Sequence, residues 1–160
     1  MAVPNGASEE GDASPAVRPA REANPVAESL IEVARYGDVD GVEELLEQNV
    51  HVDSQDMQGR TALHMAAANG HMEVVLFLLN RGADVNVEND EKNTPLHWAA
   101  LNGHIQVSEE LIVRGANAST LNRYDRTPLD EAVSRGKQAV VDAIITATTA
   151  ASLATADVQE

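Results

Sequence analysis

The feature that most constrains the fold is a segment that occurs three times at a constant spacing. The copies read RTALHMAAANGH from Arg60, NTPLHWAALNGH from Asn93 and RTPLDEAVSRGK from Arg126. Four positions hold the same residue in every copy: Thr61, Thr94 and Thr127; Leu63, Leu96 and Leu129; Ala66, Ala99 and Ala132; and Gly70, Gly103 and Gly136. Such regular repetition is typical of a stack of similar structural units, each of which contacts mainly its neighbours.

Each copy contains the local signals of two consecutive helices. The Thr can cap a first helix, and Pro95 and Pro128 follow at an early position that needs no N–H donor. Gly70 and Gly103 stand where that helix must end, which favours a residue that tolerates a positive φ. A second apolar run, such as MEVVLFLL at 72–79, again has helical spacing. An extended segment suited to a β-hairpin separates it from the next copy.

A degenerate copy precedes these three. Shifting back by the same interval preserves apolar and glycine positions such as Leu30, Ala34, Gly37 and Leu45, while the Thr and the His are missing. The period, together with a Thr-Pro-Leu-His-x-Ala core, resembles the ankyrin repeat. We therefore expect an all-α ankyrin-repeat solenoid of four helix-turn-helix repeats with β-hairpin fingers. The predicted repeats are 24–56, 57–89, 90–122 and 123–149.

The two ends of the chain differ in composition from the repeats. Residues 1–23 are rich in Ala, Pro, Gly, Ser and Glu, which predicts a disordered tail, and residues 150–160 are predicted to fray after prolonging the last helix by a turn or two. Neither an apolar signal core nor a run of roughly 20 apolar residues is present, so we expect no membrane contact. The absence of Cys fits a cytoplasmic and possibly nuclear protein.

The repeated histidines are the first candidates for a metal or catalytic site. His64 and His97 share one repeat position, and His71 and His104 share another. A zinc site needs ligands within about 2 Å of one ion, whereas equivalent residues of adjacent repeats lie roughly 10 Å apart. We therefore predict that these imidazoles bond the backbone or the hairpins, and that the chain has no metal, no cofactor and no catalytic residue. Trp98 is expected to pack in the core or between helices.

The resemblance to ankyrin repeats implies that a partner protein binds at the hairpin tips and on the inner faces of the first helices. These positions are Met57, Gln58, Arg60, Asp90, Glu91, Asn93, Arg123, Tyr124 and Arg126 at the tips, and Arg35, Tyr36, Asn69, Leu101, Asn102 and Arg135 on the helices. Tyr36, Leu101 and Tyr124 suit contact anchors, although ordinary surface scatter would also place such residues there. Lys92 and Asp125 replace the glycine at Gly59, which predicts tips of different shape.

Negative charge is concentrated in the first repeat. The chain has 26 acidic and 11 basic residues, and residues 24–56 alone hold nine acids and one base. Asp40, Glu43, Glu44 and Glu47 follow helical spacing and form one acidic face of the predicted second helix. This face is either the polar outer surface that the end of a solenoid needs or a footprint for a basic partner. It disfavours direct binding of nucleic acid, which is itself anionic.

Four segments resemble a narrower family. ARYGD, GRTALHMAAANGH, EKNTPLHWAALNGH and RTPLDEAVSRGK are similar to the small eukaryotic ankyrin-repeat chaperones dedicated to small-subunit ribosomal protein number three. The resemblance implies a non-catalytic escort, monomeric when free, that keeps a basic ribosomal protein soluble during small-subunit biogenesis. The alternative is an ankyrin-repeat adaptor in signalling or transcription.

Overall fold

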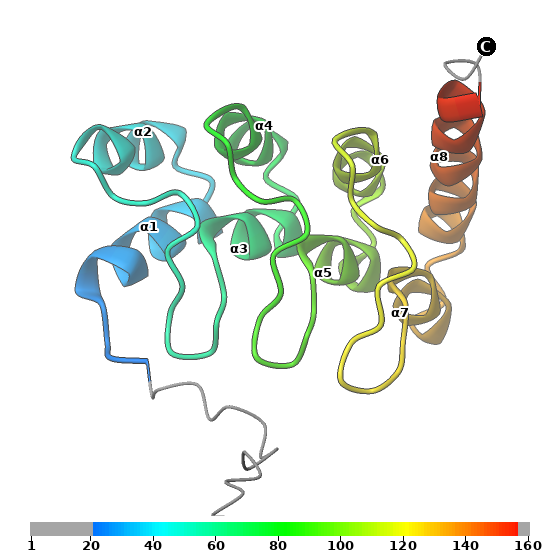
Figure 1. Ribbon diagram of the computed structural model, residues 1–160, viewed down its shortest axis with the longest axis horizontal. Coiled ribbons are helices and arrows are strands. Elements are labelled where there is room, and N and C mark those ends of the chain that lie inside the picture. Colours follow the sequence, from blue (N-terminus) through cyan, green and yellow to red (C-terminus); the bar gives the residue numbers. More distant parts are fainter. Residues whose placement is uncertain (1–20, 157–160) are drawn as a thin grey trace, which may run out of the picture.

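The computed structural model describes residues 21–156, and this range folds into a two-layered stack of helices (Figure 1). The first of each two consecutive helices forms the inner layer, and the second forms the outer layer. The inner helices are α1 (Pro25–Arg35), α3 (Ala62–Ala68), α5 (Pro95–Asn102) and α7 (Pro128–Ser134). The outer helices are α2 (Val39–Glu47), α4 (Met72–Asn80), α6 (Ile105–Val113) and α8 (Gln138–Ala156). The all-helical prediction is confirmed, and most of the predicted 1–23 tail lies outside the described residues.

The expected signals start and end the inner helices. Thr61, Thr94 and Thr127 each accept a hydrogen bond from the backbone N–H three residues on, at 3.3, 3.4 and 3.1 Å. These bonds satisfy N–H groups that the first turn of a helix leaves without partners. After the helices, Gly70 and Gly103 adopt φ values of 72° and 81°, where a side chain would be strained. The prediction of Thr caps and glycine stops is thus confirmed.

A continuous apolar core runs along the stack between the two layers. The inner-helix leucines Leu30, Leu63 and Leu96 are at most 1% exposed, and each contributes roughly 1.5–3 kcal/mol by leaving water. Ala66 and Ala99 are completely buried on the same helices. Because alanine has so small a side chain, neighbouring inner helices can approach closely, which sets the spacing of the stack.

The loops between the pairs are tight turns, and no residue from 21 to 156 lies in a β-strand. Asp56, Asn89 and Asn122 occupy the same position in successive units and are only 6%, 5% and 3% exposed. The side-chain Oδ1 of each accepts the backbone N–H groups two and four residues later, at 2.9 to 3.1 Å. These side-chain bonds take up N–H groups that a β-ladder would use, so the described loops lack the strands expected of β-hairpin fingers.

The tips of the three loops share one backbone conformation. Lys92 and Asp125 have φ values of 61° and 56°, close to the 76° of Gly59. The prediction that their tips differ in shape from that of Gly59 is therefore wrong. The turn imposes a left-handed residue whatever its side chain, and the two non-glycine residues bear the resulting strain.

The last helix runs past the predicted end of the fourth repeat. α8 continues to Ala156, about two turns beyond residue 149, in line with the expected prolongation by a turn or two. Only the first half of α8, with Val140, Val141, Ala143 and Ile144, is buried against the stack. Alanine favours helix strongly, and no Gly or Pro follows Gly136, so the helix continues beyond its packing surface. Neither α8 nor any other helix from residue 21 to 156 is long and apolar enough to cross a membrane.

Replacing Lys92 by glycine is expected to stabilise the protein. Lys92→Gly removes the strain of a left-handed non-glycine residue and should raise the free energy of unfolding by about 1 kcal/mol, because that conformation costs roughly 1–2 kcal/mol for L-residues. Lys92→Ala is the matched control, since it removes the same charge and keeps the strain. Urea unfolding measures both. A glycine variant no more stable than the alanine variant would contradict this reading of the tip.

Candidate protein-interaction surface

The repeated histidines connect neighbouring units of the stack. Nδ1 of His64 accepts the N–H of Thr61 at 3.2 Å, so Nε2 carries the proton and donates to the carbonyl of Asn93 at 2.8 Å. His97 makes the equivalent bond to the carbonyl of Arg126 at 2.9 Å. Both side chains are fully buried. Each imidazole therefore ties an inner helix to the loop that begins the next unit.

The second pair of histidines bonds in the opposite direction along the stack. Nε2 of His71 lies 2.8 Å from the carbonyl of Arg35, and Nε2 of His104 lies 2.9 Å from that of Ala68. The prediction that the four repeated histidines bond the backbone is confirmed. Between residues 21 and 156, no three His, Asp or Glu side chains gather closely enough to hold a metal ion.

Burial keeps the bridging imidazoles neutral. Loss of hydration lowers the pKa of His64 from 6.5 to about 4, against the opposing effect of its bond to the Asn93 carbonyl. The same loss of hydration lowers the pKa of His97. Asp130 replaces the histidine in the last copy and accepts the N–H of Thr127 at 2.9 Å, and its hydrogen bonds with Thr127 lower the pKa of its carboxyl group.

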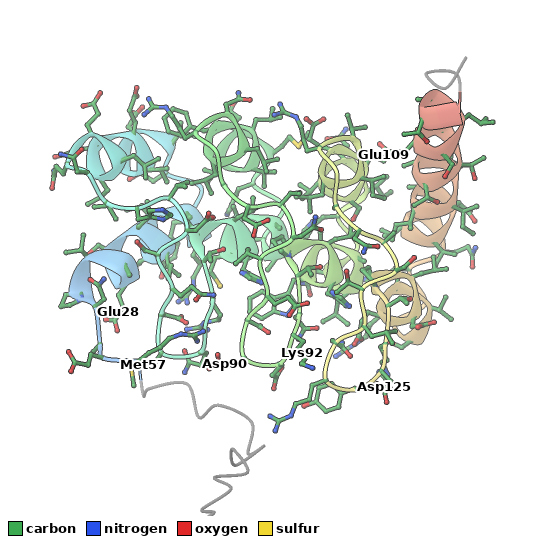
Figure 2. The ribbon with its side chains drawn as sticks, viewed as in Figure 1. Glu28, Met57, Asp90, Lys92, Glu109 and Asp125 are labelled. Atoms are coloured by element: carbon green, nitrogen blue, oxygen red, sulfur yellow. The ribbon has the colours of Figure 1, made fainter. Side chains whose placement is uncertain are left out.

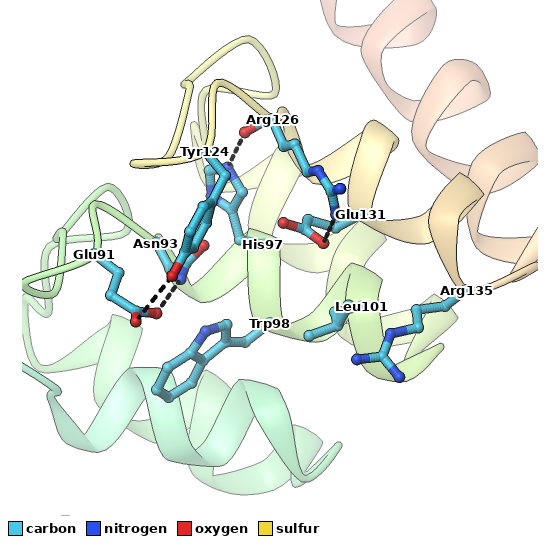
Figure 3. Close-up of a pocket in the computed structure, with 9 residues that line it drawn as sticks. All are labelled: Glu91, Asn93, His97, Trp98, Leu101, Tyr124, Arg126, Glu131 and Arg135. Atoms are coloured by element: carbon cyan, nitrogen blue, oxygen red, sulfur yellow. Dashed lines mark hydrogen bonds and ion pairs between the residues drawn. The ribbon is translucent and has the colours of Figure 1, made fainter.

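A hollow of about 420 Å³ opens on the inner side of the stack, between α5, α7 and the loops that precede them (Figure 3). Six of its lining residues were predicted to contact a partner, and three were not. The predicted residues are Glu91, Asn93, Leu101, Tyr124, Arg126 and Arg135, and the others are His97, Trp98 and Glu131. The structure thus places the predicted contact residues of the third and fourth repeats around one hollow.

Trp98 was expected to pack in the core or between helices, and only part of it does. Its indole lies 5.3 Å from the ring of His64, centroid to centroid, at an angle of 65°. The rest of the half-buried side chain lines the hollow, opposite Tyr124 in the view of Figure 3. Met65 and Glu131 occupy the equivalent position in the other copies, so its variability could have marked it as a surface position.

Several predicted contact residues are engaged within the fold. Asn93 is only 7% exposed and accepts a bond from Asn122 at 2.9 Å, so little of its side chain is free for a partner. A side chain at the base of the turn is buried by the loop of the next unit. Arg60 pairs with Asp56 at 2.6 Å, and the amide of Asn102 donates to the carbonyl of Ala68. The amide of Asn69 likewise donates to the carbonyl of Met65.

The remaining loop residues form a joined rim. The N–H of Asp90 donates to the carbonyl of Gln58 at 3.0 Å, and the N–H of Arg123 donates to that of Glu91 at 2.8 Å. Consecutive tips are therefore held to one another, and Figure 2 shows them in a row below the helices. Met57 is 51% exposed on this rim.

The other predicted anchors differ in accessibility. Tyr36, at the end of α1, is 71% exposed, and Tyr124 is 62% exposed. Arg35 and Leu101 are half-buried. Thus both tyrosines are open to a partner, whereas Leu101 offers only part of its side chain.

The acidic face lies on α2, in the outer layer at the N-terminal end of the stack. Asp40, Glu44 and Glu47 are exposed, while Glu43 is half-buried and lies 3.8 Å from Arg81. Within residues 21–156, the other three carboxylates form no ion pair. The acidic face and the hollow therefore occupy different parts of the molecule.

Comparison with known families decides the classification. A family model described as ankyrin repeats (3 copies) matches residues 21–89 and 81–154. The chain belongs to the ankyrin-repeat family. Ankyrin repeats are protein-binding modules.

Two curated relatives from Arabidopsis thaliana share short segments with this ankyrin-repeat chain. Integrin-linked protein kinase 1 is 54% identical over 37 residues, which is 23% of this chain and 8% of that protein. Serine/threonine-protein kinase 12 is 39% identical over 46 residues, which is 29% of this chain and 10% of that protein. Because the chain spans a tenth or less of these relatives, their kinase names describe those proteins alone.

The buried His64 predicts that acid weakens the fold. Between pH 6.5 and about 4, His64 is protonated in the unfolded chain but stays neutral in the folded one. The free energy of unfolding should therefore fall as the pH falls through this window. The full effect of this site is about 3 kcal/mol. Urea unfolding at pH 7 and at pH 4.5 measures it.

A variant that cannot titrate provides the comparison. His64→Gln should be less stable at pH 7 and should lose less stability on acidification than the unmodified chain. Val74→Ala, a change in the fully buried apolar core, should lower stability equally at both pH values. An unchanged pH dependence in His64→Gln would contradict the assignment.

Proposed function

We propose that the chain is a non-catalytic escort that binds a basic protein, with the client drawn from the small ribosomal subunit. Membership of the ankyrin-repeat family supports protein binding. The finer proposal rests on the resemblance to the chaperones of small-subunit ribosomal protein number three and on the charge of the N-terminal end. Small-subunit ribosomal protein number three is the candidate client, and the work would be done in the cytoplasm and the nucleus.

The observation that carries the proposal is the uncompensated charge of the first helix pair. Seven exposed carboxylates in this pair or beside it form no ion pair within residues 21–156: Glu22, Glu28, Glu32, Asp38, Asp40, Glu44 and Glu47. Like charges held together repel one another and weaken the fold, and a basic client relieves this repulsion. A surface of one sign also raises the rate of association with an opposite partner by roughly 10- to 1000-fold.

An internal contact supports the same chemistry at the rim. The guanidinium of Arg21 pairs with the carboxylate of Asp90, beside Gly59. A Cβ at Gly59 would lie 2.8 Å from the Asp90 carboxylate oxygen and still closer to the guanidinium, so the missing side chain leaves room for the contact. The rim thus accepts an arginine side chain from the same molecule, and a client can offer similar groups.

A second candidate function is an adaptor in signalling or transcription. The exposure of Tyr36 and Tyr124, at 71% and 62%, favours it, because exposed aromatic rings are common anchors at protein interfaces. In that function the buried contact area supplies most of the binding free energy, and charge contributes little.

The escort function predicts binding that salt weakens. Purified small-subunit ribosomal protein number three should bind at least tenfold more weakly at 300 mM than at 50 mM NaCl, because the Debye length falls below about 10 Å in this range. The variant Asp40→Asn/Glu43→Gln/Glu44→Gln/Glu47→Gln should associate several-fold more slowly and show a smaller salt effect. Stopped-flow and equilibrium binding measurements give both quantities.

A matched variant tests whether position matters more than net charge. Glu73→Gln/Glu88→Gln/Glu109→Gln/Asp142→Asn removes four exposed carboxylates outside the first helix pair and should change the association rate much less. Equal effects of the two variants would contradict a role for the acidic face. Binding that is insensitive to salt and lost on Tyr124→Ala would favour the adaptor.

A further inference from the structure

Two aromatic rings from different parts of the chain face the hollow. Trp98 comes from α5, and Tyr124 comes from the loop between α6 and α7 (Figure 3). The contact with the buried ring of His64 holds the indole in place before any ligand arrives. A planar cation that enters the hollow would find one preorganised aromatic face and a second ring nearby. Guanidinium groups stack well on such faces.

A carboxylate without a cation lies at the same end of the hollow. Within residues 21–156, the carboxylate of Glu91 accepts two long hydrogen bonds, from the hydroxyl of Tyr124 at 3.5 Å and from the amide of Asn93 at 3.4 Å. It forms no ion pair among residues 21–156. These neutral contacts orient the carboxylate without neutralising it. A guanidinium can pair with such a group through two parallel hydrogen bonds.

The opposite end of the hollow carries positive charge. Arg126 lies 3.7 Å from Glu131, and Arg135 forms no ion pair within the described chain. Figure 3 shows Arg135 beside Leu101, away from Glu91. Because Glu131 compensates Arg126, Arg135 is the group that repels a second cation at this end. The hollow therefore favours one cationic side chain at the Glu91 end over a continuous basic run.

We infer that the hollow is a binding site for a single arginine side chain of the partner, stacked against Trp98 and paired with Glu91. This inference rests on the proposed basic partner and adds to it a specific side chain and the residues that receive it. Lysine fits less well, because its ammonium group is not planar and cannot pair through two parallel bonds.

Trp98 makes the site directly observable, because it is the only tryptophan of the chain. The probe is the peptide acetyl-Gly-Arg-Gly-amide, titrated into the full chain while tryptophan fluorescence is recorded. We expect a saturable change with a Kd in the millimolar range, as befits one side chain. The matched citrulline peptide has the same shape without the charge and should bind at least fivefold more weakly.

Two single variants test whether Glu91 is the group that pairs with the arginine side chain. Glu91→Gln should weaken the arginine peptide at least fivefold and leave the citrulline peptide unaffected. Glu88→Gln removes an exposed carboxylate of the same loop that does not line the hollow, and it should change neither titration. Urea unfolding checks that both variants remain folded.

Equal binding of the arginine and citrulline peptides, absence of saturation, or a Glu91→Gln variant that binds arginine normally would overturn the inference. Tighter binding of acetyl-Gly-Glu-Gly-amide would also overturn it and would assign the hollow to an acidic group at Arg135. Since the titration uses no client, it succeeds or fails separately from the salt-dependent binding of the ribosomal protein.

Discussion

A buried, neutral imidazole joins each central helix pair to the next. His64 accepts a hydrogen bond from the cap of its own helix through one nitrogen and donates to the following loop through the other, at 2.8 Å from the Asn93 carbonyl. Its pKa of about 4 keeps this pattern of one acceptor and one donor intact at neutral pH. The bond fixes where the next loop starts, and the Asp or Asn at the base of each loop then fixes its shape. The positions of the loops therefore depend on a side chain that is completely buried.

The positions that repeat and the positions that vary have different tasks. Repeated Thr, Leu, His, Ala and Gly face the caps, the core and the turns, where each meets the same need in the units that contain it. Trp98 shows the opposite case, since methionine and glutamate replace it in the neighbouring units and it faces the hollow. Charge varies in the same way, with exposed carboxylates on the first helix pair and arginines at the far end of the hollow. Selectivity for a partner then comes from the differences between units.

The helices were predictable because their signals are local. Threonine caps, glycine stops and apolar spacing each depend on a few neighbouring residues. The loop turns were missed because Asp56 is replaced by asparagine in the later copies, which hides a shared position from a search for identical letters. Asn93 was placed on the surface because its burial depends on the next loop, which lies far along the chain. α8 runs past residue 149 as its composition predicted, since alanine-rich sequence continues a helix without any packing surface.

Only some of the residues that line the hollow could be predicted from the sequence, for a similar reason. Tyr124 and Leu101 were chosen from their repeat positions, whereas the role of Trp98 depends on the direction of its ring. The contact with His64 sets that direction, and it arises from the packing of one inner helix against another. The direction of such a side chain is fixed only when the neighbouring helices have packed together, so it cannot be predicted from nearby sequence.

The most direct test of the account is hydrogen–deuterium exchange of the chain with and without a bound client. The account predicts that binding slows exchange most in the loops at 57–60, 90–93 and 123–126 and in the first helix pair. Protection confined to the outer sides of α4 and α6, with these loops unchanged, would contradict it.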